Sequence, residues 1–194
     1  MIGKNLVCGI GINDNSIPTR KNGLMVREYN IWRKMLERAY AGAYHANKPT
    51  YIGCSVSDNF KYYHLFHAWC QTQVGFGVEG YQLDKDILIK GNKVYSESTC
   101  IFVPSKLNNL FTKHNSARGT CPIGVRVHGN RFQARGRDDE GYVHLGTFDT
   151  AELAFFAYNA FKEAYIKKQA ERYRSVIDIR AYEALMNYSV DIGD

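Results

Sequence analysis

The chain has 194 residues, enough for one domain with a sizeable core or for two small domains. It carries 25 Lys and Arg against 19 Asp and Glu, a formal net charge of +6. No apolar run approaches the length of a membrane span, and the N-terminal stretch MIGKNLVCGIGIND has neither the charged start nor the long apolar core of a secretion signal. We therefore expect no membrane span and a cytoplasmic location.

The positive charge is unevenly distributed along the chain. Residues 1–120 carry 15 Lys and Arg against 8 Asp and Glu, a net +7, whereas residues 121–194 carry 10 against 11, a net −1. Within the second part, residues 121–137 hold four Arg and no acid. A basic surface favours the phosphate backbone of nucleic acid as a partner, because phosphate neutralisation releases counterions. An acidic protein surface or anionic lipid would satisfy the same charge, but no basic amphipathic helix indicates a membrane.

The cysteines are odd in number, widely spaced and never arranged as Cys-x-x-Cys. This spacing argues against a zinc knuckle and against a disulfide framework, and it fits a reducing cytoplasm. We expect structural thiols at all of these positions, which are Cys8, Cys54, Cys70, Cys100 and Cys121.

Two amphipathic helices are predicted in the first part of the chain. In residues 28–40 the apolar side chains recur at helical spacing and the charged ones occupy the opposite side. A second helix is predicted over residues 59–71, with Ser57 or Asp58 as its N-cap and an apolar stripe of its own. We expect both stripes to pack into a core.

Residues 82–111 are predicted to form a compact unit of strands and a helix. The pattern indicates a strand, a turn at residues 90–93, a second strand that runs through Val103, and a helix that Pro104 opens. Residues 112–121, TKHNSARGTC, are polar and poor in apolar side chains, so this segment is the predicted linker.

The most informative segment begins at Gly124, where three strands and a long helix are predicted. In the second strand, polar residues occupy every other position. Because alternate residues of a strand face the same way, these side chains share one surface, whereas Phe132 and Ala134 face the core. The first and third strands repeat this division. The outward set comprises Arg126, His128, Arg131, Gln133, Arg135, Arg137 and His144.

Such a sheet face suits the major groove of duplex DNA, because Arg guanidinium groups match guanine edges and phosphates. The alternative is an ordinary solvated sheet face, which is common for charged residues. The outward side chains are nearly all donors, with no lysine among them. This composition favours DNA binding.

The segment from Pro122 to Ala170 resembles the DNA-binding domain of plant ethylene-response factors (the Apetala family). The resemblance lies in GVR, the basic second strand and LGTFDTAELAFFAYNAFKEA. It implies a three-stranded antiparallel sheet that reads DNA and a helix packed behind it. The implied DNA-reading residues are Arg126, Gln133, Arg135, Arg137 and His144. The family has Glu at the position of Arg135 and Trp at that of His144, so the base sequence that it reads is not transferred.

Most of residues 1–111 resembles the HNH-like proteins of phages, many of which are linked to modules of the ethylene-response-factor type. The pattern is W-x2-ML-x-R-x-Y from residue 32, an aromatic-rich helix ending near residue 69, and LDKDIL-x2-GNKVYS-x3-C-x-FVP-x3-N. This group contains homing and nicking endonucleases, which hold one divalent metal and a general base over a phosphodiester. The resemblance implies metal ligands at Asp84 and Asn108, and it places Lys85 where the family has its catalytic histidine.

Lys85 is the main departure from the nuclease pattern. A histidine can take a proton from the attacking water, whereas a protonated lysine cannot. Strong desolvation or a neighbouring cation would be needed for Lys85 to act as a base. Thr99 similarly replaces the asparagine that braces the loop of the motif.

Three possibilities stay open for this site. First, the base comes from elsewhere, and the candidates are His64, His67 and His114. Second, hydrolysis depends on Mg²⁺ or Mn²⁺ alone; two of the oxygen ligands are expected to share one face of a strand, and the full set is Asp84, Asp86 and Asn108. Third, the module binds phosphates without chemistry, through Lys85, Lys90 and Lys93.

We predict an α+β protein with two modules. Residues 1–111 form an HNH-like strand–strand–helix module with N-terminal helices, residues 112–121 the linker, and residues 122–194 the three-stranded antiparallel sheet packed on a long helix, with a C-terminal helix. The expected function is binding of double-stranded DNA in the cytoplasm of a bacterial host, as for a phage protein, and metal-dependent nicking is left open. The alternatives are a non-catalytic regulator and a phage factor that acts on a host defence protein. The oligomeric state also stays open.

Overall fold

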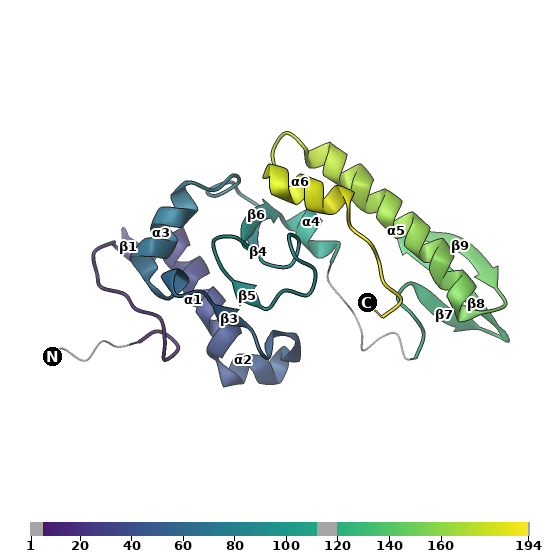
Figure 1. Ribbon diagram of the computed structural model, residues 1–194, viewed down its shortest axis with the longest axis horizontal. Coiled ribbons are helices and arrows are strands. Elements are labelled where there is room, and N and C mark those ends of the chain that lie inside the picture. Colours follow the sequence, from purple (N-terminus) through teal and green to yellow (C-terminus); the bar gives the residue numbers. More distant parts are fainter. Residues whose placement is uncertain (1–5, 112–119, 194) are drawn as a thin grey trace. The chain divides into compact units, whose positions relative to one another are not determined.

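The computed structural model describes residues 6–111 and 120–193. Helices and strands follow one another along the chain as in Figure 1, and the α+β class is confirmed. His114 and residues 112–119 of the predicted linker lie outside the described residues. The chain divides into two compact units, residues 1–105 with 176–181 and residues 106–175 with 182–194.

The first unit is built around its helices. They are α1 (Arg27–Tyr40), α2 (Gly42–Asn47), the 3-10 turns η1 (Pro49–Tyr51) and η2 (Asn59–Lys61), and α3 (Tyr63–Gln71). The apolar stripe of α1 packs into the core as predicted, with Trp32, Met35 and Leu36 fully buried. The Trp32 indole Nε1 donates a 2.7 Å hydrogen bond to the Phe60 carbonyl, so the largest core side chain also satisfies its polar atom.

The single helix predicted over residues 59–71 is wrong at its first turn. Tyr62 is extended, with φ −96° and ψ 123°, and separates η2 from α3. The cause lies far away in the sequence: Ile12 pairs with this segment, donating its N–H to the Lys61 carbonyl and accepting from the Tyr63 N–H. This pairing takes the backbone groups that a continuous helix would use. Neither Ser57 nor Asp58 caps α3, which begins at Tyr63.

Three small two-stranded sheets complete the first unit. Strand β1 (Arg20–Lys21) pairs with β2 (Leu24–Met25), β3 (Ser55–Val56) with β5 (Val94–Tyr95), and β4 (Tyr81–Asp84) with β6 (Ile101–Pro104). The β4–β6 pair is antiparallel and is followed by α4 (Ser105–Asn109), in the predicted strand–strand–helix order. The predicted second strand is in fact two strands with different partners, because β5 pairs in parallel with β3.

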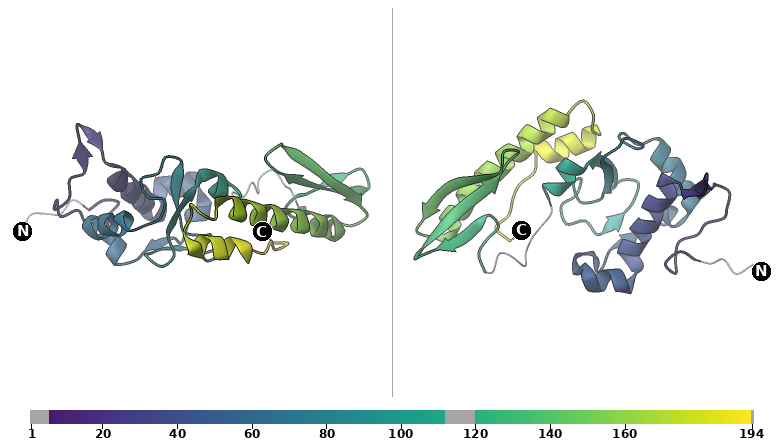
Figure 2. Two further views of the ribbon diagram at one scale, coloured as in Figure 1. Left: turned by 90° about the horizontal axis from the view of Figure 1, so that it is seen from above. Right: turned by 180° about the vertical axis from the view of Figure 1, so that it is seen from behind.

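The second unit contains the antiparallel sheet β7–β8–β9 and the long helix α5. The bounds are β7 (Val125–His128), β8 (Arg131–Arg137), β9 (Tyr142–Phe148) and α5 (Ala151–Tyr173); α6 (Ile179–Met186) belongs in part to each unit. Helix α5 lies along one face of the sheet (Figure 2). Thr150 caps it by accepting from the Leu153 N–H at 3.2 Å.

Small residues let α5 approach the sheet closely. Ala134 and Ala154 are fully buried between the two layers, together with Phe155. A Cβ atom at Gly136 would lie 2.2 Å from the Phe161 ring, so this strand position requires glycine. The predicted division of the sheet into a core face and an outward face follows from this packing.

In the described part of the chain, no helix is long and apolar enough to cross a membrane. All five cysteines are free thiols. Three of them are buried in the first unit, and burial raises the pKa of the Cys70 and Cys100 thiols. These two side chains therefore pack as apolar groups, as structural thiols do.

Candidate nucleic-acid interface

The strand pairing brings the seven predicted outward side chains of β7, β8 and β9 onto one face. Three directly opposed pairs fix this arrangement; they are Arg126 with Gln133, His128 with Arg131, and Arg135 with His144. The register shifts between Ala134 and Arg135, where β9 has one extra residue. The bulge keeps the alternation intact on both sides, because β8 itself runs regularly from Arg131 to Arg137. The predicted shared face is confirmed.

Two of the arginines on this face already have polar partners. Arg126 donates from Nε to the Gln133 side-chain oxygen at 2.6 Å, which orients both groups across β7 and β8. Arg131 forms an ion pair with Asp149 at 2.8 Å, and the Asp149 side chain is 81 % exposed. Exposed ion pairs contribute little free energy, so this contact holds Arg131 only weakly.

The arginines at the other end of β8 are arranged around an aromatic ring. The guanidinium carbon of Arg135 lies 4.6 Å from the centroid of the Tyr142 ring, and that of Arg137 lies 5.4 Å from it. Tyr142 is 71 % exposed. Among the described residues, no carboxylate forms an ion pair with Arg135 or Arg137. Two positive side chains are thus held side by side on an exposed surface without neutralisation.

Tyr142 was missed by the sequence reasoning, although a signal was present. It precedes His144 by two residues, so the strand alternation that places His144 outward also places Tyr142 outward. It stands directly opposite Arg137 in the pairing of β8 with β9. The aromatic ring therefore belongs to the candidate interface.

Two of the three acids that follow β8, Asp138 and Asp139, accept hydrogen bonds from groups outside this face. Asp138 accepts from the backbone N–H groups of Glu140 and Gly141 and closes the β8–β9 loop. Asp139 accepts from Gln169 at 3.1 Å, on α5. Hydrogen bonds from Gln169 and Tyr165 hold the pKa of Asp139 below its usual value, so it stays ionised. These two carboxylates therefore do not neutralise the arginine face.

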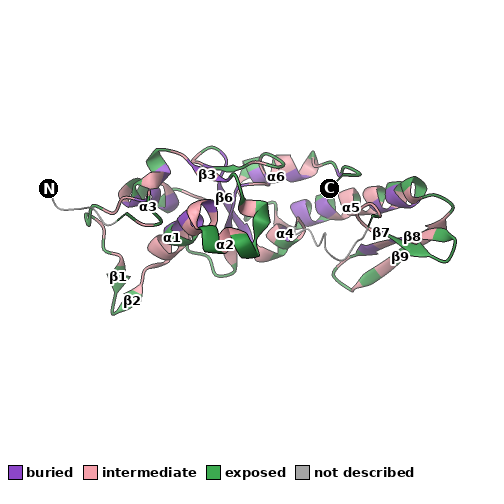
Figure 3. Cartoon of the chain, turned by 90° about the horizontal axis from the view of Figure 1, so that it is seen from below, coloured by how far each residue is buried: buried purple, intermediate pink, exposed green. Residues whose placement is uncertain are grey.

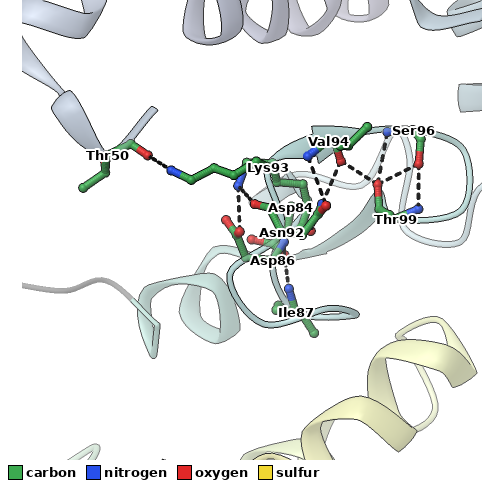
Figure 4. A network of polar contacts seen from close by, with 10 residues as sticks. Thr50, Asp84, Asp86, Ile87, Asn92, Lys93, Val94, Ser96 and Thr99 are labelled. Atoms are coloured by element: carbon green, nitrogen blue, oxygen red, sulfur yellow. Dashed lines mark hydrogen bonds and ion pairs between the residues drawn. The ribbon is translucent and has the colours of Figure 1, made fainter. Parts of the chain in front are cut away.

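The predicted nuclease site in the first unit is a tightly bonded turn (Figure 4). Asp84 is the last residue of β4 and is 8 % exposed. Its Oδ1 accepts from the backbone N–H groups of Asp86 and Ile87, at 2.8 and 2.7 Å. Desolvation raises the pKa of Asp84 above its usual value, and the two backbone donors oppose that shift. Asp84 therefore holds the turn that follows β4.

The prediction that Asp84 and Asp86 share a strand face is wrong. Strand β4 ends at Asp84, and the chain bends so that the Asp86 N–H reaches back to the Asp84 carboxylate. Within residues 6–111 and 120–193, no group of three or more His, Cys, Asp or Glu side chains is arranged to hold a metal ion. Asn108 lies in α4 within the second unit, so its pairing with Asp84 stays a prediction.

Lys85 is committed to local structure. It is 6 % exposed, and its ammonium donates at 2.6 Å both to the Asp86 carboxylate and to the Asn92 carbonyl. Asn92 in turn donates from its amide to the Lys85 and Val94 carbonyls. The buried ammonium thus joins the turn after β4 to the loop before β5. These contacts use Lys85 as a donor, which is the opposite of the role of a general base.

The remaining candidates have separate partners in the first unit. Lys93 donates to the Thr50 carbonyl at 2.6 Å, and Lys90 is exposed. On α3, His64 lies 2.9 Å from the Asp14 carboxylate, and His67 lies 3.5 Å from the Gln71 amide. The structure therefore supplies both histidines with partners of their own.

We expect Asp84→Asn to leave the turn folded and to change how stability depends on pH. The asparagine Oδ1 can accept the same two backbone N–H groups. Because the folded-state pKa of Asp84 is raised, the wild type loses stability as pH rises from the unfolded value through the folded one. The variant lacks this loss, so it should gain stability relative to the wild type across that window and keep the gain at neutral pH. Urea unfolding of both proteins between pH 3.5 and about 7 measures this difference.

The matched control for this experiment is Asp84→Ala, which leaves two backbone donors without their acceptor. We expect a loss of about 3 kcal/mol at pH 7 from the unmade hydrogen bonds. Equal stabilities for the alanine and asparagine variants would contradict the structural role assigned to Asp84.

Comparison of the chain with protein-family models, with curated proteins and with solved structures finds no match. The resemblances to HNH-like proteins and to the ethylene-response-factor domain therefore stay predictions.

Proposed function

We propose that this protein binds double-stranded DNA through the exposed face of β7–β8–β9. The observation that carries the proposal is the pair of guanidinium groups of Arg135 and Arg137, which flank the exposed Tyr142 ring without an ion-pair partner among the described residues. An arginine fork can donate two hydrogen bonds to the O6 and N7 atoms of guanine, and it binds phosphates equally well. Within the described residues of the second unit, helix α5 packs on the opposite face of the sheet.

The rest of the chain supports the same partner. Residues 1–120 carry a net charge of +7, which attracts any duplex without regard to its sequence. Exposed basic residues of that part, among them Lys90, fit contacts to phosphates. The free thiols fit a reducing compartment such as the cytoplasm.

Cleavage is not part of the proposal. Lys85 donates to Asp86 and Asn92, and Asp84 accepts two backbone hydrogen bonds, so both residues stabilise the turn after β4. Supercoiled plasmid incubated with Mg²⁺ or Mn²⁺ tests the nuclease alternative. We expect the plasmid to stay intact. Nicking by the wild type that is lost in the folded Asp84→Asn variant would instead establish a metal-dependent endonuclease.

The DNA-binding proposal is tested by titrating a fluorescent duplex with the protein at several salt concentrations. If about five basic groups reach phosphates, the slope of log K against log salt should be about −4.5. An affinity that does not change with salt, or the absence of binding at low salt, would refute the proposal and favour a protein partner such as a host defence protein.

Tyr142→Ala is expected to weaken duplex binding by about 5- to 30-fold. The substitution removes no charge, but it frees the Arg135 and Arg137 side chains, and each lost cation–π contact accounts for about 0.5–1 kcal/mol. Tyr142→Phe keeps the ring and serves as the control, with an expected change of less than about 3-fold. Equal losses for the two variants would show that the hydroxyl, and not the stacking, contributes to binding.

A further inference from the structure

Helix α5 is apolar on two opposite sides. One side packs on the sheet through Ala154, Phe155 and Tyr158. On the other side, Leu153 is 50 % exposed and Phe156 is 62 % exposed. A helix that exposes its polar face to water needs only one apolar stripe, whereas one that is apolar on both sides requires a second partner. Buried and exposed residues both occur along α5 in Figure 3.

The exposed residues of α5 form a continuous stripe. Leu153, Phe156, Ala160 and Ala164 are spaced by three, four and four residues, which places them on one side of the helix. The two alanines carry the smallest side chains of the stripe and allow another helix to approach closely. Charged residues stand at the two ends: Glu152 in the first turn, and Lys167 and Lys168 three to four residues beyond Ala164. Between them, Glu163 lies along the edge of the stripe, where its carboxylate accepts from the Val190 N–H at 2.9 Å.

We propose that this stripe pairs with the same stripe of a second copy of the chain, with the two α5 helices antiparallel and the two-fold axis at Ala160. In this register, positions whose numbers sum to about 320 oppose each other. Phe156 then lies over Ala164 of the second copy, so a large side chain meets a small one. Glu152 comes beside Lys167 and Lys168 of the second copy, so opposite charges meet at both ends.

The charges on α5 favour the antiparallel pair of helices over a parallel pair. Parallel pairing would set Glu152 against Glu152 and Lys167 against Lys167, and like charges at this distance repel. It would also bring the two Phe156 rings together and leave the two alanine positions facing each other, with a gap. The antiparallel pair is isologous and closed, as expected for a dimer of identical chains.

The proposed dimer is independent of DNA binding. The stripe lies on the side of α5 that faces away from the sheet, and the arginine face lies on the side of the sheet that faces away from α5. The dimer is therefore measured without DNA.

The first test is the mass of the full-length protein by analytical ultracentrifugation at about 1–100 µM. We expect a dimer for the wild type and a dissociation constant raised at least about 30-fold for Phe156→Glu, because a charge would then be buried against Ala164 of the second copy. Val127→Glu is the matched control: Val127 is 63 % exposed, close to the value for Phe156, but it lies on β7 and should leave the dimer unchanged. A monomeric wild type throughout this range would overturn the proposal.

The second test reads the register by cysteine cross-linking in a Cys8→Ser, Cys121→Ser background. Ala160→Cys should form a disulfide between two chains, because this residue meets its own copy at the axis. Ala164→Cys should not, because four residues from the axis place the two copies about 12 Å apart along the helices, beyond disulfide reach. Cross-linking at both positions would indicate parallel helices, and cross-linking at neither would overturn the stripe as the interface.

Discussion

Replacing Arg135 and Arg137 together by alanine is expected to weaken duplex binding about 1,000-fold. Each arginine that reaches a base edge or a phosphate contributes about 2 kcal/mol, and the double variant loses both contacts. The Tyr142 ring holds the two guanidinium groups side by side, so under the DNA-binding proposal they would contact neighbouring positions of the duplex. Fluorescence anisotropy with a duplex at low salt measures the loss.

The control for the double variant is Arg174→Ala. Arg174 is also exposed, at 64 % of its side chain, and it stacks on Tyr182 away from the sheet. This substitution removes one positive charge but should change the affinity by less than about 3-fold. Unchanged binding by the double variant would show that β8 and β9 do not form the DNA interface.

Single substitutions separate the two kinds of contact. Arg135→Lys retains the charge but removes the planar fork. If Arg135 reads a base, this variant should bind most duplexes at nearly wild-type strength while losing about 1–3 kcal/mol of discrimination at one position. An equal loss on every duplex would instead identify a phosphate contact.

Gly124→Ala is expected to destabilise the sheet-and-helix unit by about 4 kcal/mol. Gly124 has a φ of +77°, where an L-residue costs about 1–2 kcal/mol. In addition, a Cβ atom at this position would lie 2.0 Å from the Tyr158 ring, so α5 would have to move away from the sheet. Because the chain has two units, hydrogen-exchange mass spectrometry on peptides from residues 120–175 is the suitable measurement.

Gly129→Ala separates the two causes of this effect. Gly129 also has a positive φ, +61°, but nothing lies within 4 Å of its added Cβ. We expect a loss of about 1 kcal/mol from backbone strain alone. Equal losses at the two glycines would mean that Tyr158 adapts to the added methyl group at no cost.

An antiparallel α5 dimer would give the proposed DNA-binding surface two-fold symmetry. An isologous dimer presents two identical arginine faces related by a two-fold axis. Such proteins bind sites in which one half repeats the other in inverted order. A selection experiment from random duplexes therefore distinguishes a dimeric reader, which enriches inverted repeats, from a monomeric one, which enriches single sites.

Local patterns in the sequence determined the parts of the fold that depend on near neighbours. The alternation from Arg131 to Arg137 sufficed to place the arginines on one face, because strand geometry alone sends every second side chain the same way. The stripe of α1 predicted its buried side for the same reason, with Trp32 in the core.

Contacts between distant segments were decided only by the tertiary structure. Pairing with Ile12 breaks the helix at Tyr62, and pairing with Ser55–Val56 separates β5 from β6. The bend after Asp84, which ruled out the shared face with Asp86, closes through a side-chain hydrogen bond. The spacing of apolar residues does not predict such contacts, because the backbone and side-chain groups that form them could equally well form hydrogen bonds with near neighbours in the chain. The same holds for the ion pair of Arg131 with Asp149 and for the contact of Arg135 with the Tyr142 ring, which depend on how β9 and its flanking loop fold back onto β8.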